Sequence, residues 1–334
     1  MSTSAGHDGV TRPRVGFLGT GWIGRHRMAA MIETGGIEAV AICDPSADCL
    51  AEATALAPGA AVVDSLEAML AGGVDAVVIA TPSALHADQS IQALQAGAAV
   101  FCQKPLGRSG AETQAVIDAA HAADRLLGVD LSYRHTEGMQ RIAPLVQDGT
   151  LGALFAIDLT FHNAYGPGKP WFFDPAQSGG GCVIDLGVHL VDLALWTLGF
   201  PAVDDVQATL LAGGKPLGPG QVEDYATARF TAGGVDIRLA CSWNLHAGRE
   251  AVIEAAFYGT HGGAALRNVA GSFYDFTAEH FTGTGTTLLA GPPDAWGARS
   301  AAAWAEQLAR DGRFDPAADQ FAQSATVLDR IYGR

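Results

Sequence analysis

The chain has 334 residues, and a composition of 49% hydrophobic and 16% charged residues excludes a largely disordered protein. The formal net charge of −15 leaves few cations for a basic face, so we expect no nucleic-acid partner. The sequence contains no uninterrupted apolar run of about 18 residues, and we therefore expect no membrane span. The length itself predicts two domains.

The five cysteines indicate reduced thiols rather than a disulfide framework, because their number is odd and no pair has the C-x-x-C spacing of a zinc or redox site. They stand at Cys43, Cys49, Cys102, Cys182 and Cys241. We expect no metal centre. The polar start of the chain lacks the apolar stretch of a signal peptide. These features predict a cytoplasmic protein.

After a flexible N-terminus over residues 1–13, short apolar strands alternate with Ala-rich helical segments up to residue 132. The predicted strands are Val15–Leu18, Ile37–Cys43, Ala61–Val63, Val74–Ala80, Ala98–Cys102 and Leu126–Leu131. The predicted helices are Ile23–Glu33, Ala47–Ala55, Leu66–Leu70, Ala84–Gln95 and Ala111–Ala123. Nearly continuous apolar strands that alternate with helices predict a parallel sheet with both faces covered. Six such strands indicate a doubly wound, Rossmann-type nucleotide-binding domain over residues 14–132.

The regular alternation of predicted strands and helices ends in residues 133–334. A helix over Thr136–Gln147 and a strand over Leu154–Phe161 precede an irregular stretch, and a strong helix over Val183–Leu198 then ends at Gly199. The strands that follow are Val206–Leu211, Tyr225–Phe230, Val235–Ser242, Ala251–Tyr258 and Ala264–Val269, and the closing helices are Ala295–Arg310 and Ala317–Ile331. Strands without intervening helices predict an antiparallel or mixed sheet in a second α/β domain.

A G-x-G-x-x-G motif follows the first predicted strand and opens the first predicted helix. It comprises Gly19, Gly21, Trp22, Ile23 and Gly24, with Thr20 between the first two glycines. The glycines allow a tight turn, close approach of a pyrophosphate and close helix–strand packing. Asp44 ends the second strand, 20 residues after Gly24, where a carboxylate accepts hydrogen bonds from ribose hydroxyls. Because this carboxylate would repel a 2′-phosphate, NAD is favoured over NADP.

Two further strand ends supply candidate cofactor contacts, since ligands of such sheets bind at the carboxyl edge. The first end supplies Thr81, Pro82 and Ser83, with His86 in the next helix, and the second supplies Gln103 and Lys104. Helix capping is an equally good interpretation of Thr81 and Ser83. Pro105 turns the chain out of the sheet, so Lys104 is predicted to stay at this edge.

A second chemical cluster lies in Gly179–Asp192, where three successive glycines precede the long helix. The glycines predict a close approach to another group, and Gly187 inside the helix indicates a crowded neighbour. Asp185, His189 and Asp192 stand at i, i+4 and i+7, so we expect them to share one helix face. We expect Asp192 to be the structural member of this set.

These motifs resemble the glucose–fructose oxidoreductase / inositol dehydrogenase / MocA family over nearly the whole chain. The resemblance rests on Gly19–Gly24, Lys104-Pro105, Tyr133-Arg134 and Gly179–Asp192. It implies a C-terminal α/β domain with an open, mostly antiparallel sheet, a homodimer or homotetramer, and a catalytic set of Lys104, Asp185 and His189. The family's Glu-Lys-Pro element reads Gln103-Lys104-Pro105 here, and a neutral amide stabilises a protonated lysine less than a carboxylate does.

The activity that this resemblance implies is hydride transfer between the nicotinamide cofactor and a hydroxyl or keto carbon of a sugar, inositol or related polyol. In that reaction His189 is the base, Lys104 stabilises the reacting oxygen, and Asp185 orients the substrate or the imidazole. The candidate substrate contacts are Arg134, His162, Asn163, Tyr165 and Trp171. Two alternatives remain open: a keto-sugar reductase that works in the reducing direction, and a catalytically silent regulator that binds the dinucleotide.

Overall fold

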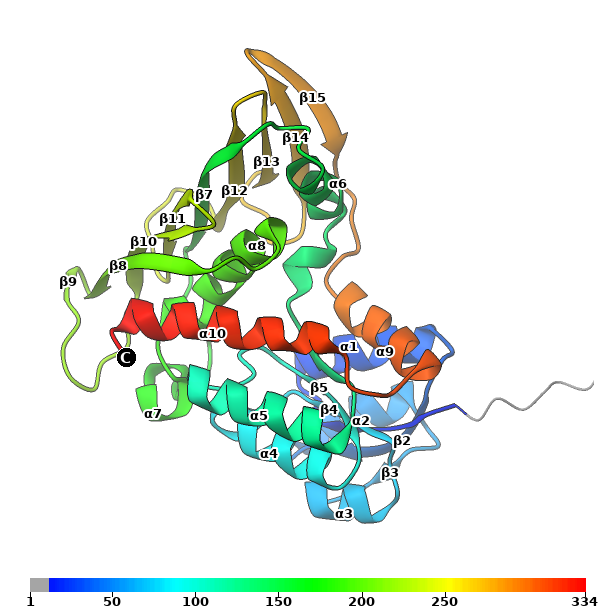
Figure 1. Cartoon of the computed structure of the whole chain (residues 1–334). Coiled ribbons are helices and arrows are strands. Elements are labelled where there is room, and N and C mark those ends of the chain that lie inside the picture. The colour runs from blue at the N-terminus through cyan, green and yellow to red at the C-terminus, as the bar shows by residue number, and fades with distance from the viewer. Residues whose placement is uncertain (1–11) are drawn as a thin grey trace, which may run out of the picture.

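The computed structural model describes residues 12–334, which form two sheets with helices packed around them (Figure 1). Residues 1–11, and with them nearly all of the predicted flexible segment 1–13, lie outside the described residues. The first sheet is built from strands in the N-terminal part of the chain and the second from strands in the remainder.

The first sheet has six parallel strands in the order β3-β2-β1-β4-β5-β6, the arrangement of a doubly wound nucleotide-binding domain. Its strands are β1 (Arg14–Leu18), β2 (Glu38–Cys43), β3 (Ala61–Val62), β4 (Ala76–Ile79), β5 (Ala99–Cys102) and β6 (Leu127–Val129). Strands β4 and β5 are buried at every position, which explains their continuous apolar sequence.

Helices cover both faces of this sheet. They are α1 (Trp22–Glu33), α2 (Ala47–Leu56), α3 (Leu66–Ala71), α4 (Ser83–Gln95) and α5 (Gly110–Ala123). Helices α3, α4 and α5 enclose one apolar core, to which Met69 and Leu94 contribute. Helices α1 and α2 enclose the other, together with α9 (Arg299–Arg310). The prediction assigned all of residues 133–334 to the second domain, whereas α9 packs on the first sheet because Trp304 and Leu308 lie in its core.

The second sheet has nine strands in the order β15-β14-β13-β12-β7-β11-β10-β8-β9. They are β7 (Leu154–Asn163), β8 (Val203–Ala212), β9 (Lys215–Pro216), β10 (Tyr225–Ala232), β11 (Val235–Ser242), β12 (Ala251–Gly259), β13 (Gly263–Asn268), β14 (Phe276–Thr282) and β15 (Gly285–Ala290). Only the β7–β11 pair is parallel among these described strands, so the sheet is mixed and mostly antiparallel. Strands β9, β14 and β15 were not predicted. In β15 four of six residues are exposed, which leaves no apolar alternation to detect.

The other helices of this part are α6 (Glu137–Gln147), α7 (Pro175–Ser178), a π-helical turn (Val183–Gly187), α8 (Val188–Leu198) and α10 (Asp319–Tyr332), with short 3₁₀ turns at Ser132–His135, Pro170–Phe173 and Pro316–Ala318. The main ones, α6, α8 and α10, contribute to the core on one face of the second sheet, whereas α7 contacts α4 of the first part. The stretch Pro175–Leu198 is long and apolar enough to cross a membrane, but 83% of its most apolar window is buried inside the protein. Helix α10 then runs across both parts of the molecule, along α5, α8 and β8 (Figure 1).

Candidate active site

Lys104 and Asp185 form an ion pair between the two parts of the chain. The Lys104 Nζ donates to Asp185 Oδ1 and to the Asp185 carbonyl oxygen, both at 2.7 Å. Trp243 Nε1 donates to the second carboxylate oxygen of Asp185 at 3.1 Å. Lys104 follows β5, and Asp185 lies in the π-helical turn, so the pair joins the carboxyl edge of the first sheet to the start of a helix that packs on the second sheet.

Gln103 does not touch this pair; its amide turns to Asp130. The Gln103 Nε2 donates to Asp130 Oδ2 at 2.6 Å, and Arg27 Nε donates to the same oxygen at 2.6 Å. Ser300 of α9 donates to the other carboxylate oxygen. Asp130 is almost fully buried. The carboxylate that holds Lys104 is therefore Asp185, and the residue before Lys104 belongs to a separate buried network.

His189 is the buried imidazole of the site. Its side chain is 8% exposed, its ring packs against Tyr133 at 4.9 Å between centroids, and its Nδ1 has no hydrogen-bond partner among the described residues. Burial lowers the pKa of His189 well below its ordinary value, and the nearby charges of Lys104 and Arg27 lower it further. At neutral pH the imidazole is therefore uncharged and able to accept a proton.

The predicted helix over Val183–Leu198 begins with a π-helical turn at Val183–Gly187. Such turns are rare and change which side chains share a face. Asp185 accordingly bonds Lys104 rather than His189, so the suggested orientation of the imidazole by Asp185 is not seen. Asp192 pairs with Arg134, whose Nε donates to Asp192 Oδ2 at 2.7 Å in a nearly buried contact.

A cavity of about 900 Å³ opens above Lys104 and His189. Its floor consists of Gln103, Lys104, Asp130, Ser132, Tyr133 and His189. One wall is a face of α1 with Thr34 directly after it, and the other is formed by Phe273, Tyr274, Asp294–Arg299 and Ala302. The cavity thus brings together Lys104 and His189 from distant parts of the sequence, and Trp22 and Ile23 of the glycine motif line it as well.

The glycine loop fits a dinucleotide. A Cβ on Gly24 would lie 2.1 Å from the Gly19 carbonyl oxygen, so Gly24 permits the close packing expected of the third motif glycine. Nothing lies within 4 Å of a Cβ built on Gly21, which leaves open space where a pyrophosphate would approach. The start of α1 has no side-chain cap and no acidic residue in its first turn, and Thr20 Oγ1 is buried without a partner among the described residues. The loop therefore offers free N–H groups to an anion.

Asp44 ends β2 beside this loop. Its carboxylate accepts from the Thr20 N–H at 2.6 Å and from the Ser46 N–H at 2.8 Å. Each oxygen keeps lone pairs, since a carboxylate has about four acceptor positions in all. Asp44 thus shapes the loop and still has capacity for ribose hydroxyls.

The residues that follow β4, which were predicted to contact the cofactor, make contacts within the protein. No side chain caps α4, so the capping interpretation of Thr81 and Ser83 is not seen: Pro82 stands at the N-cap position, Ser83 is the first residue of the helix and is buried, and Thr81 Oγ1 donates to Gln89 Oε1 at 2.6 Å. His86 is buried, and its two ring nitrogens lie 2.7 Å from the carbonyl oxygens of Pro105 and Thr81. His86 therefore ties the Lys104-Pro105 segment to the Thr81 segment and has no free ring nitrogen for a cofactor.

The five candidate substrate contacts lie outside the lining of the cavity. Arg134 is held by Asp192, and His162 Nδ1 is 2.8 Å from Ser242 Oγ. The Asn163 side chain accepts from the Tyr165 N–H, the Tyr165 hydroxyl faces Glu250, and Trp171 stacks on Phe172 at 3.8 Å. Trp243, Tyr274 and Trp296 were not predicted, because each is brought to the site by long-range packing that leaves no local sequence signal. Asp130 was also missed, although its position directly after β6 places it at the carboxyl edge of the first sheet.

Comparisons with known proteins give a family match for each of the two parts of the chain. Residues 13–131 match the family model "Oxidoreductase family, NAD-binding Rossmann fold", and residues 139–265 match "GFO/IDH/MocA C-terminal domain". The chain is 31% identical over 272 residues to D-glucoside 3-dehydrogenase of Escherichia coli (strain K12), with 76% of each chain covered. It is 30% identical over 210 residues to levoglucosan dehydrogenase of Pseudarthrobacter phenanthrenivorans, with 56% of this chain and 53% of the relative covered.

The fold also matches a solved structure described as levoglucosan dehydrogenase in complex with NADH and levoglucosan. The TM-score is 0.81 at 22% sequence identity, and 97% of both chains is covered. At this identity the likeness shows the fold alone.

Proposed function

Because the chain belongs to the GFO/IDH/MocA family of NAD-binding oxidoreductases, we propose that it oxidises a hydroxyl-bearing carbon of a sugar, inositol or related polyol. The observation that carries this proposal is the shared cavity of Lys104 and His189, with the Lys104–Asp185 ion pair beside it. The relatives named D-glucoside 3-dehydrogenase and levoglucosan dehydrogenase support the substrate class.

The proposed proton transfer follows from the uncharged imidazole of His189 and from the contacts of Lys104. Oxidation of an alcohol removes a hydroxyl proton, and the uncharged imidazole of His189 is the base that accepts it. Lys104, held by Asp185, donates a hydrogen bond to the same oxygen and stabilises its developing negative charge. NAD, when bound, supplies the hydride acceptor. The same groups serve the reverse reaction, with His189 as the acid.

The cofactor is held by the glycine loop Gly19–Gly24 and by Asp44. The first turn of α1 carries the N–H groups that bind the pyrophosphate. The Asp44 carboxylate accepts from the adenosine ribose and disfavours an added 2′-phosphate, which supports NAD over NADP. Trp22, Ile23, Gln103 and Lys104 reach from this edge into the cavity.

The charges around the cavity favour an uncharged substrate. Among the described residues that line it, the arginines and the lysine each pair with a carboxylate: Arg27 with Asp130, Lys104 with Asp185, and Arg299 with Asp294. Phosphate recognition typically uses arginine clusters that are free to bind an anion. We therefore expect neutral sugars or glycosides to be better substrates than sugar phosphates or nucleotide-linked sugars.

The test is NAD reduction over a panel of neutral glycosides, inositols and sugar phosphates, followed by His189→Ala and Lys104→Ala on the best substrate. We expect each substitution to lower kcat by about 100-fold or more. The exposed residues His246 and Lys215 provide matched controls, and His246→Ala and Lys215→Ala should retain wild-type turnover. The assignment fails if both site variants keep wild-type turnover while NAD binding is unchanged.

We also propose that the enzyme is a cytoplasmic homodimer or homotetramer that associates through the second sheet. The face of this sheet opposite α6, α8 and α10 carries an open hollow of about 780 Å³, lined by polar and charged side chains such as Asp158, Arg229 and Arg238. All five cysteines are free thiols, which suits a reducing compartment. Light scattering on the purified protein, with Arg238→Glu as the disruptive variant, measures the oligomeric state.

A further inference from the structure

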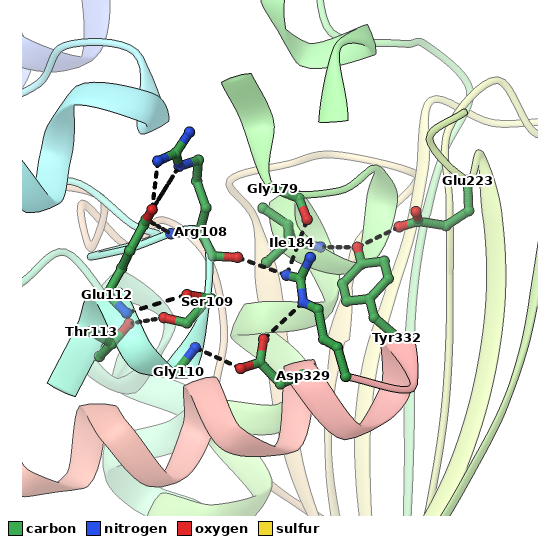
Figure 2. A network of polar contacts seen from close by, with 11 residues as sticks. Arg108, Ser109, Gly110, Glu112, Thr113, Gly179, Ile184, Glu223, Asp329 and Tyr332 are labelled. Atoms are coloured by element: carbon green, nitrogen blue, oxygen red, sulfur yellow. Dashed lines mark hydrogen bonds and ion pairs between the residues drawn. The ribbon is translucent and has the colours of Figure 1, made fainter. Parts of the chain in front are cut away.

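The C-terminal end of α10 contacts both chain segments that carry the Lys104–Asp185 pair (Figure 2). We call Glu223, Asp329, Tyr332 and Arg334 the C-terminal clasp. On one side they bond the segment that follows Lys104, and on the other they bond the start of the helix that contains Asp185. No residue of the clasp lines the catalytic cavity.

The clasp caps the helix of Asp185 and His189. The first N–H groups of a helix have no partner within it. Here the carboxylate of Glu223 accepts from the N–H groups of Gly181, at 3.0 and 3.1 Å, and of Val183, at 2.8 Å. The Glu223 carbonyl accepts from the Cys182 N–H at 3.0 Å, and the Tyr332 hydroxyl accepts from the Ile184 N–H at 3.2 Å. Four successive N–H groups are thus bonded by two residues from elsewhere in the chain.

The glycine trio of this helix start faces the clasp. A Cβ on Gly181 would lie 1.9 Å from the Glu223 carbonyl oxygen, and one on Gly180 would lie 2.1 Å from the Tyr332 hydroxyl. Gly179 has a φ of +86° and packs against Arg108. The close approach predicted for these glycines is therefore an approach to the clasp and to Arg108.

The C-terminal end of α10, with Arg334 just after it, also bonds the chain segment that follows Lys104. Asp329 Oδ2 accepts from the Gly110 N–H, at the start of α5, at 2.7 Å. Arg334 donates to the Arg108 carbonyl at 2.7 Å and to the Gly179 carbonyl at 3.1 Å, and it pairs with Asp329 at 3.0 Å. Arg108 lies four residues after Lys104, so one short segment of α10 connects the chain around Lys104 to the chain around Asp185.

We propose, building on the proposed function, that Tyr332 is a positioning residue that sets the contact between Lys104 and Asp185. Its hydroxyl is suited to this because it accepts from the Ile184 N–H and donates to Glu223 Oε1 at 2.8 Å (Figure 2). A phenylalanine removes the acceptor of the Ile184 N–H and one of the donors to the buried Glu223 carboxylate, which keeps only the Gly181 and Val183 N–H groups. The helix start then shifts, and the Asp185 carboxylate moves with it, away from the Lys104 ammonium.

Burial supports this role, since Glu223 is 0% exposed and Tyr332 is largely enclosed. Burial raises the pKa of Glu223, and burial beside Glu223 raises the pKa of Tyr332 well above its ordinary value. The Tyr332 hydroxyl therefore keeps its proton and remains the donor to Glu223 over the working pH range.

The experiment compares Tyr332→Phe with Arg330→Ala, in the full-length enzyme saturated with NAD. Arg330 lies on the same helix and donates to the Val203 carbonyl, so it controls for loosening of α10 outside the clasp. We expect Tyr332→Phe to lower kcat about tenfold with NAD affinity changed less than twofold, and Arg330→Ala to lower the melting temperature without changing kcat. In a Lys104→Ala background, Tyr332→Phe should cause no further loss of residual turnover.

A second readout does not depend on turnover and keeps the proposal testable if the substrate class is wrong. The indole N–H of Trp243 donates to Asp185, so its ¹⁵N–¹H resonance, assigned with Trp243→Phe, reports the position of that carboxylate. It should shift in Tyr332→Phe and in the milder Arg334→Ala, and stay in place in Arg330→Ala. An unchanged Trp243 resonance in Tyr332→Phe, or a loss of kcat that adds fully to that of Lys104→Ala, would overturn the proposal. A wild-type enzyme that is inactive on the whole sugar panel would instead count against the proposed function alone.

Discussion

Gln103→Glu restores the acidic residue that the family carries before the lysine, yet we expect it to destabilise this protein. The Gln103 Nε2 donates to Asp130 Oδ2 at 2.6 Å, and Asp130 is 1% exposed. The substitution puts a carboxylate oxygen where that donor was. Two charges about 4 Å apart repel by about 4 kcal/mol at an effective dielectric constant of about 20.

The folded variant can avoid this repulsion by protonating the introduced glutamate, which then donates to Asp130 as the amide did. At pH 7 the proton costs about 4 kcal/mol, because the pH is about 2.7 units above the ordinary glutamate pKa and each unit costs about 1.4 kcal/mol. At pH 5 the same proton costs about 1 kcal/mol. The pKa of the introduced glutamate is raised in the folded state, so the stability of the variant relative to the wild type is highest below about pH 4.3 and falls as the pH rises.

Urea unfolding at pH 5, 6 and 7, followed by tryptophan fluorescence, measures this dependence. We expect Gln103→Glu to lose about 3–4 kcal/mol at pH 7 and about 1 kcal/mol at pH 5, relative to the wild type at each pH. Gln103→Met, which lacks the charge, should lose the same amount at every pH. Adding Asp130→Asn to Gln103→Glu should recover most of the loss at pH 7. Equal losses at pH 5 and pH 7, or no loss, would refute the reasoning.

Two further predictions concern His189 and Trp304. Since the pKa of His189 is lowered by burial and by Lys104, the midpoint of the acid limb of kcat/KM for oxidation should lie below pH 6.5. A midpoint above pH 6.5 that persists in His189→Gln would contradict the assignment of His189 as the base. Trp304 is 5% exposed and packs on Phe101, 5.5 Å between ring centroids, so Trp304→Ala should cost about 3–5 kcal/mol in urea unfolding and Trp304→Phe clearly less. A cost below about 1 kcal/mol for Trp304→Ala would show that α9 does not support the first sheet.

The strands and helices of the first sheet could be predicted because each of them has its own local sequence pattern. Strands buried on both faces read as apolar runs, such as Ala76–Ile79, and each run is followed by its helix. The carboxyl ends of these strands then locate Asp44 and Lys104 without any knowledge of the second sheet. The position of β15, with four exposed residues, carries no such pattern.

The site was predictable in its residue types and only partly in its contacts. Lys104, Asp185 and His189 were found from their motifs, but the partner of each side chain depends on packing between distant segments. Arg134 lies next to Tyr133 of the cavity floor and still turns to Asp192. Glu223, an acidic residue in a Gly- and Pro-rich stretch, reads as a surface loop residue although it is fully buried. These contacts join residues that are far apart in the chain, so no local spacing in a single sequence predicts them.

Because α9 packs on the first sheet, the order in which the chain is translated decides when that sheet can complete its core. A ribosome that has translated residues 14–132 has made all six strands of that sheet and none of α9. Phe101 and the space above Gly128, which Trp304 fills, stay open until the strands of the second sheet have also emerged. Residues 14–132 alone therefore lack the part of their core that α9 supplies, and this part arrives only late in translation. The nucleotide-binding half is completed almost last, and a gene fragment that ends at residue 132 encodes a sheet that keeps α1 and α2 on this face but lacks α9.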